Sequence, residues 1–156
     1  MITKKLLIGA ALAAATFANA EAFADTTNRD VIAAMFEAFN AHDVDALKAI
    51  YAPDAVVYSP ESCEPRVGRD AIGASYAELF EQIPDVHDTV QTIVSEGNRA
   101  AVVFTAASRQ PGMEFELAIS AFLVIENGLV VEDRVFFDTD VAPACEETDS
   151  KAKGNP

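Results

Sequence analysis

The chain has 156 residues, of which 25 are acidic and 11 are basic, so its formal net charge is −14. A chain this acidic is not expected to bind nucleic acid or an anionic membrane surface, because both attract basic patches. With 51% hydrophobic residues, its length suits one domain with a sizeable core. The acidic residues are scattered along the sequence, which favours a role in solubility over recognition of a cationic partner.

The first residues are typical of a secretory signal peptide. Lys4 and Lys5 precede an apolar stretch over 6–18, and Ala-x-Ala cleavage patterns end at Ala20 and Ala24. The apolar stretch is shorter than the roughly 20 residues that span a bilayer. We therefore predict a signal peptide over 1–24, cleaved after residue 20 or 24, with no membrane span and a periplasmic or secreted mature protein. A buried N-terminal helix is the alternative interpretation.

Three helices are predicted after this segment. Apolar residues at helical spacing follow polar capping residues and indicate a first helix over about 28–40. Asp43 can cap a short second helix that a proline ends. The third helix is expected over 69–82. Between the second and third helices, 55–59 is a short β-type run and 60–68 a loop.

The rest of the chain has the pattern of β-strands. An Asn-Gly pair at 127–128 predicts a tight hairpin turn, because both residues tolerate positive φ. The domain over 25–138 is therefore expected to be α+β, with three N-terminal helices packed on a curved, mostly antiparallel sheet, and 139–156 to be a polar tail. The predicted strands of the antiparallel meander cover 86–96, 99–109, 113–125 and 129–138.

The last hairpin carries apolar residues on both faces. Its two-residue turn would pair Ile125 with Val130 and, in the absence of a bulge, Leu123 with Glu132. One apolar face can cover the helices. The other would leave a contiguous apolar area exposed, which usually marks an interface, so we predict a homodimer through the sheet.

Two cysteines, Cys63 and Cys145, lie in the mature part of the chain. In an oxidising compartment they predict one disulfide, with two free thiols as the alternative. Neither cysteine has the spacing of a metal ligand pair, and the two histidines do not either. We predict no metal site and no cofactor.

Several motifs resemble the SnoaL-like branch of the nuclear transport factor 2-like superfamily, which includes steroid isomerases and polyketide cyclases. The resemblance covers roughly 28–138 and implies a conical α+β barrel with an apolar pocket that is open at one end. It is specific for the fold and weak for function, because this fold supports many activities. The matching stretches are 39–47, 51–56, 68–72, 84–87, 127–128 and 137–138.

The resemblance also bears on catalysis. Epoxide-hydrolase-like members end in a strand of the type Trp-Arg-Asp-Tyr-Phe-Asp with a catalytic central Asp, and Val135 stands in that position here. Valine cannot exchange protons, so this chemistry is not expected. Cyclase-like members use an acid near the end of the same strand, and Asp138 is the nearest match. A strand-end carboxylate that accepts backbone hydrogen bonds is the alternative for Asp138.

Five residues are predicted to line the pocket. They are Tyr58, His87, Phe104, Val135 and Phe137. Core packing is the alternative for Tyr58, and a solvated side chain is the alternative for His87.

These observations support three hypotheses. The first is an exported domain that binds a small apolar molecule in a conical pocket. The second is an isomerase- or cyclase-like enzyme that uses Asp138, with Tyr58 and His87 as possible partners. The third is a structural dimer module with a closed core.

Overall fold

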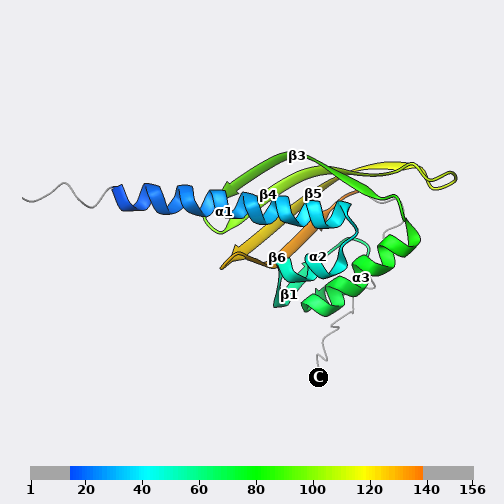
Figure 1. The fold of residues 1–156 in the computed structure, drawn as a ribbon, viewed down its shortest axis with the longest axis horizontal. Helices are drawn as coiled ribbons and strands as arrows, with labels where there is room; N and C mark the ends of the chain where they lie inside the picture. Colours follow the sequence, from blue (N-terminus) through cyan, green and yellow to red (C-terminus); the bar gives the residue numbers. More distant parts are fainter. Residues whose placement is uncertain (1–14, 139–156) are drawn as a thin grey trace, which may run out of the picture.

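The computed structural model describes residues 15–138, with side chains described from Thr27 onward. The chain folds into three helices and six strands (Figure 1). The helices are α1 (Ala15–Asn40), α2 (Val44–Ile50) and α3 (Arg69–Gln82). The strands are β1 (Tyr51–Tyr58), β2 (Arg66–Val67), β3 (His87–Glu96), β4 (Arg99–Ser108), β5 (Phe115–Glu126) and β6 (Leu129–Phe136).

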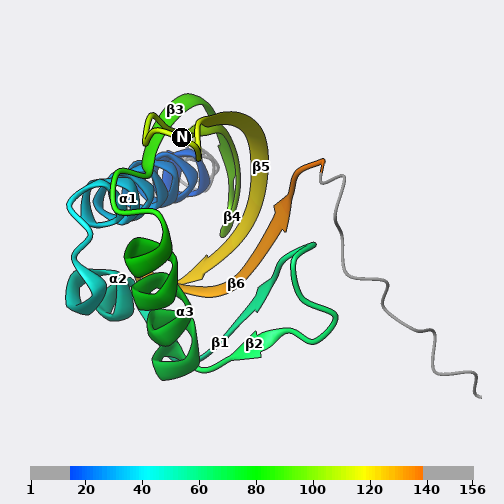
Figure 2. The same cartoon turned by 90° about the vertical axis from the view of Figure 1, so that its right-hand side faces the viewer.

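The strands form one mixed sheet in the order β2-β1-β6-β5-β4-β3. Strands β3 to β6 make the predicted antiparallel meander, whereas β1 pairs with β6 in parallel. Figure 2 shows the sheet curving around the helices, which all lie on its concave side. The α+β class is therefore confirmed. The short strand β2, which pairs with β1, lies in a segment that the sequence predicted as a loop.

Helix α1 packs one apolar face against the sheet. Ile32, Met35, Phe36 and Phe39 are buried at helical spacing and join the main hydrophobic cluster. The helix begins at Ala15, well before the predicted start near residue 28, so it runs through both predicted cleavage positions. Its last turn leads into α2, where the Asp43 side chain accepts a hydrogen bond from the amide of Ala46, as the capping prediction required.

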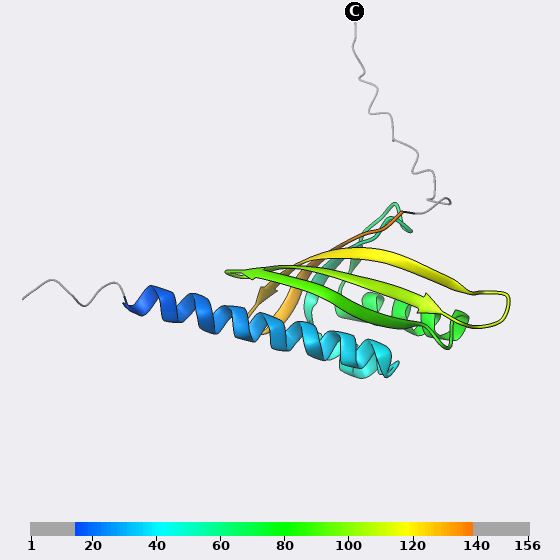
Figure 3. The same cartoon turned by 90° about the horizontal axis from the view of Figure 1, so that it is seen from above.

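Two asparagines fasten α1 to β3. Near the middle of α1 the Asn28 side chain donates to Ser95 Oγ, at the end of β3, at 3.0 Å and to the Gly97 carbonyl at 2.9 Å. At the end of α1 Asn40 donates to the Asp88 carbonyl at 2.9 Å and accepts from the Asp88 amide at 2.8 Å. Figure 3 shows the helix lying along this strand. The helix is thus held antiparallel to β3 over nearly the whole strand.

The β5–β6 hairpin turns at Asn127 and Gly128, whose φ values are 52° and 78°. The predicted pair of Ile125 with Val130 is confirmed. Beyond it the predicted register is wrong, because a β-bulge adds one residue to β6. Leu123 therefore lies opposite Asp133 and not opposite Glu132.

Three predictions fall partly outside the described residues. These are the start of the signal peptide, the polar tail and Cys145, so the Cys63–Cys145 disulfide stays a prediction. Within residues 15–138, no helix is long and apolar enough to cross a membrane.

Candidate functional site

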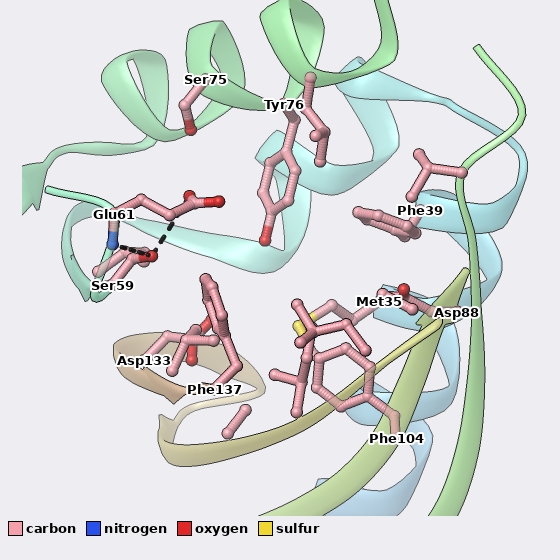
Figure 4. Close-up of a pocket in the computed structure, with 18 of the residues that line it drawn as sticks. Met35, Phe39, Ser59, Glu61, Ser75, Tyr76, Asp88, Phe104, Asp133 and Phe137 are labelled. Atoms are coloured by element: carbon pink, nitrogen blue, oxygen red, sulfur yellow. Dashed lines mark hydrogen bonds between the residues drawn. The ribbon is translucent and has the colours of Figure 1, made fainter. Parts of the chain in front are cut away.

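A cavity of about 230 Å³ lies between the concave face of the sheet and helices α1 and α3. Most of its wall is apolar, with aromatic rings contributed by both helices and by the sheet (Figure 4). The few polar side chains in this wall therefore decide what the cavity can do. They are Ser59, Glu61, Arg66, Ser75, Tyr76, Asp88 and Asp133.

Asp133 is the carboxyl at the centre of a hydrogen-bonded cluster. It is only 3% exposed, and its Oδ2 accepts a hydrogen bond from the Tyr51 hydroxyl at 3.0 Å. The hydroxyls of Tyr51 and Tyr76 lie 2.9 Å apart. When Asp133 is ionised and takes the only hydroxyl proton of Tyr51, Tyr76 is the donor to Tyr51. Asp133 is thus joined to the two tyrosines by a hydrogen bond at Oδ2, while Oδ1 has no hydrogen-bond partner among the described residues.

Local folding explains this placement. Tyr51 stands where α2 ends and β1 begins, and it is fully buried. Tyr76 reaches the cluster from α3. Asp133 lies opposite Val57 of β1 and Leu123 of β5, so it stands in the middle of the sheet on the inward face.

Burial sets the proton affinity of this cluster. Loss of solvation raises the pKa of Asp133 from its ordinary value of 3.8 to about 7, although the hydrogen bond from Tyr51 works in the opposite direction. Burial also raises the pKa of Tyr51, so its hydroxyl stays protonated. A carboxyl tuned in this way can accept or donate a proton near neutral pH.

A second buried carboxyl, Asp88, lies in the wall on strand β3. It is 7% exposed, and its Oδ1 also has no partner among the described residues. Burial raises the pKa of Asp88 to about 7. In Figure 4 it lies beside Met35 and Phe104, away from Asp133.

Another part of the wall is more polar. Ser59 Oγ donates to Glu61 Oε2 at 3.4 Å, and Arg66 lies 3.7 Å from the same carboxylate. Glu61 is exposed and Ser59 and Arg66 are partly exposed. These three residues therefore form the side of the cavity that contacts solvent.

The structure brings three of the five predicted pocket residues together in the cavity wall: Phe104, Val135 and Phe137. Tyr58 and His87 lie elsewhere. The Tyr58 ring packs under the Arg134 guanidinium at 4.0 Å on the outer face of the sheet. His87 is exposed. Both residues differ from the expectation for the same reason, since successive side chains of a strand point to opposite faces and their neighbours Val57 and Asp88 are the inward ones.

Asp138, the predicted catalytic acid, is exposed and does not line the cavity. The buried carboxyls in the wall are Asp133 and Asp88, neither of which was predicted from the sequence. The sequence did contain a signal that Asp133 faces the cavity. Side chains alternate between the two faces of a strand, and Asp133 stands two residues before Val135, which was predicted to line the pocket. Nothing comparable in the sequence shows which face of β3 is inward.

The described residues contain no cluster of three or more His, Cys, Asp or Glu that could hold a metal ion. The polar groups in the cavity wall are its carboxyls, its serine and tyrosine hydroxyls and the Arg66 guanidinium.

Residues 32–133 match the family model of the SnoaL-like domain. A loop-truncation variant of IdmH is 30% identical, with a TM-score of 0.64, covering 70% of this chain and 91% of that protein. Wild-type IdmH from Streptomyces antibioticus, a candidate polyketide cyclase, is 28% identical over the same shares with a TM-score of 0.64. A candidate SnoaL-like polyketide cyclase from Jannaschia sp. CCS1 is 21% identical, covering 72% of this chain and 86% of that one, with a TM-score of 0.65. The chain thus belongs to the SnoaL-like domain family.

Proposed function

We propose that this domain binds a small, mostly apolar carbonyl compound and catalyses proton transfer on it, with Asp133 as the general acid and base. The observation that carries the proposal is the Asp133 carboxyl in the cavity wall, with one oxygen bonded by Tyr51 and the other without a partner among the described residues. The proposal replaces Asp138 by Asp133 within the isomerase- or cyclase-like hypothesis.

A buried carboxyl without a full set of hydrogen bonds costs folding stability. A fold that retains one in an apolar wall, with its pKa near the working pH, has the arrangement expected of a catalytic group. Asp133 Oδ1 would take a proton from the carbon next to a carbonyl and return it to another atom of the same molecule. Tyr51, in turn supported by Tyr76, stabilises the carboxylate through Oδ2 while Oδ1 reacts.

The cavity limits the size of the substrate. A buried apolar cavity of about 150 Å³ holds one benzene molecule. The volume of about 230 Å³ here is larger by about half, so it suits a two-ring molecule or a single ring with a short chain. The apolar wall favours a substrate with few polar atoms.

Kemp elimination of nitrobenzisoxazole tests this proposal without knowledge of the natural substrate. In that reaction a base removes the ring C–H proton, the N–O bond breaks and a coloured phenolate forms. We expect turnover above the buffer rate that rises with pH around 7, the pKa of Asp133. Asp133→Asn should lower the rate by about a hundredfold or more.

Glu116→Gln provides the matched control, because it removes one carboxylate from an exposed site on β5 that pairs with Arg109. This variant should keep the wild-type rate. Full activity in Asp133→Asn, or loss of activity only in Asp88→Asn, would contradict the assignment of Asp133.

Binding without catalysis is the second candidate, and the observation that favours it is Val135 in the cavity wall. It predicts a rate equal to that of buffer together with retention of an apolar ligand. Native mass spectrometry of the purified protein would detect such a ligand. A closed structural core, the third hypothesis, is not favoured by a cavity of this size.

The same proposal includes a homodimer through the outer face of the sheet. Phe122 and Phe136 are 52% and 55% exposed there, and their rings contact each other edge to face at 5.7 Å. A second copy of the chain would bury this apolar pair. Light scattering should give the mass of a dimer for the wild type and of a monomer for Phe122→Ser, whereas Met113→Ser, at an exposed position in the turn between β4 and β5, should leave the dimer intact.

Export to the periplasm or the medium is also part of the proposal, and Lys4, Lys5 and the Ala-x-Ala patterns support it. Intact mass of the protein recovered from the periplasm should correspond to cleavage after Ala20 or Ala24. Recovery of the full-length chain from the cytoplasm alone would contradict it.

A further inference from the structure

Asp88 carries an inference beyond the proton-transfer role of Asp133. It is a nearly fully buried carboxyl in the wall of the same cavity, with one oxygen unpartnered among the described residues. The mechanism proposed above does not use it.

The fold holds Asp88 in place through its backbone and not through its side chain. Asn40 makes both of its hydrogen bonds with the amide and carbonyl of Asp88, and His42 Nε2 contacts the Val86 carbonyl at 2.9 Å. Within the described residues, no hydrogen bond joins the carboxyl group itself to the helix. A different side chain at this position would leave the three anchoring hydrogen bonds intact.

Asp88 and Asp133 do not form a carboxyl dyad. They lie on β3 and β6, which are separated by β4 and β5, so about 14 Å of curved sheet lies between their strands at about 4.8 Å per step. Burial is the largest cause of the raised pKa of each carboxyl. Burial is the largest cause of the raised pKa of the Tyr76 hydroxyl, and the charges of both Asp133 and Asp88 raise it further.

We propose that Asp88 is a ligand-recognition residue that hydrogen-bonds a hydroxyl or enol oxygen of the substrate, at the far side of the cavity from the carbonyl that Asp133 serves. This inference rests on the proposed function for the position of the carbonyl. It narrows the substrate class to compact apolar molecules with two separated oxygen functions.

A hydroxyl fits Asp88 in both of its protonation states. It can donate to the ionised carboxylate and can accept from the protonated acid, so the unpartnered oxygen is satisfied in either case. An ether or a hydrocarbon cannot do both and would leave the buried carboxyl unsatisfied.

Binding of naphthalene derivatives to the full-length protein tests the inference without any turnover; it is measured by calorimetry at about pH 8.5, above the pKa of Asp88, so that this carboxyl is ionised and can only accept a hydrogen bond. The probes are naphthol, the dihydroxynaphthalenes with one hydroxyl on each ring, and the corresponding dimethoxynaphthalenes. The tightest dihydroxy isomer should bind wild type about tenfold or more tightly than naphthol, as expected for one hydrogen bond to a charged group. In Asp88→Ala the affinity for this dihydroxy isomer should exceed that for naphthol by less than about twofold. The dimethoxy compounds should bind wild type no more tightly than naphthol does.

Glu96→Ala is the matched control, since it removes an exposed carboxylate from the same strand and should keep the full gain. A gain that persists in Asp88→Ala would overturn the inference, as would equal binding of dihydroxy and dimethoxy probes by wild type. Tighter binding of naphthylmethylamine than of naphthol, lost in Asp88→Ala, would instead identify a cation as the partner and also overturn it. None of these outcomes depends on Kemp elimination, so the role of Asp133 is judged separately.

Discussion

Replacement of Asp133 by asparagine should stabilise the protein, and the gain should depend on pH. Asparagine has nearly the same shape and can still accept the hydrogen bond from Tyr51, but it cannot ionise. The pKa of Asp133 rises from 3.8 to about 7 in the folded protein, a shift of about three pH units. At 1.36 kcal/mol per unit, ionising this buried carboxyl costs up to roughly 4 kcal/mol of unfolding free energy.

The direction follows from proton binding. Between about pH 4 and pH 7 the folded protein retains the Asp133 proton and the unfolded chain loses it, so the stabilising effect of protonation is complete below pH 4 and is lost as the pH rises to 7. Urea unfolding of wild type and Asp133→Asn should therefore give equal stabilities near pH 4 and a difference that grows by about 1.4 kcal/mol per pH unit, then levels above pH 7. Glu116→Gln should show no such growth. A difference that is constant with pH, or an asparagine variant that is the less stable at pH 8, would refute the reasoning.

Three further substitutions test other parts of the structure. Tyr51→Phe removes the hydrogen bond that lowers the pKa of Asp133, so the midpoint of the pH–rate profile for Kemp elimination should move upward; a downward shift would contradict the cluster. Leu123→Ala, at a position 1% exposed, should lower the unfolding free energy by about 3 kcal/mol in urea, and a loss below about 1 kcal/mol would show that the position is not packed as described. Asn40→Ala removes two hydrogen bonds to Asp88 and should cost about 2 kcal/mol and speed hydrogen exchange of the Asp88 amide, whereas unchanged exchange would show that the bonds do not form in solution.

Much of the fold could be predicted because its signals are local. The bounds of α3, Arg69–Gln82, follow from helical spacing and the proline after it, and they agree with the structure. The turn at Asn127 and Gly128 follows from the two residues themselves. The strands of the meander agree to within two residues at each end.

The residues of the candidate site could not be predicted in the same way, because their positions depend on strand pairings between distant segments. The bulge in β6 adds one residue without any Gly or Pro to mark it, and it changes which β5 residue faces Asp133. The parallel pairing of β1 with β6 joins segments about 75 residues apart, and it brings Tyr51 to the cluster. Period-two alternation alone could have associated Asp133 with Val135, but whether His87 or Asp88 faces inward depended on the packing of α1 against β3.

Asn28 and Asn40 attach a straight helix to two points of a curved strand. From Asn28 to Asn40 the helix advances about 18 Å at 1.5 Å per residue, whereas β3 from Asp88 to Ser95 measures about 23 Å when extended. The strand is the longer member, and Figure 1 shows it arching over the helix. The number of helical residues between the two asparagines therefore sets how far β3 must bend to meet both of them. A one-residue deletion in that interval would rotate one anchor by about 100° away from its strand and release the bend that shapes the chamber.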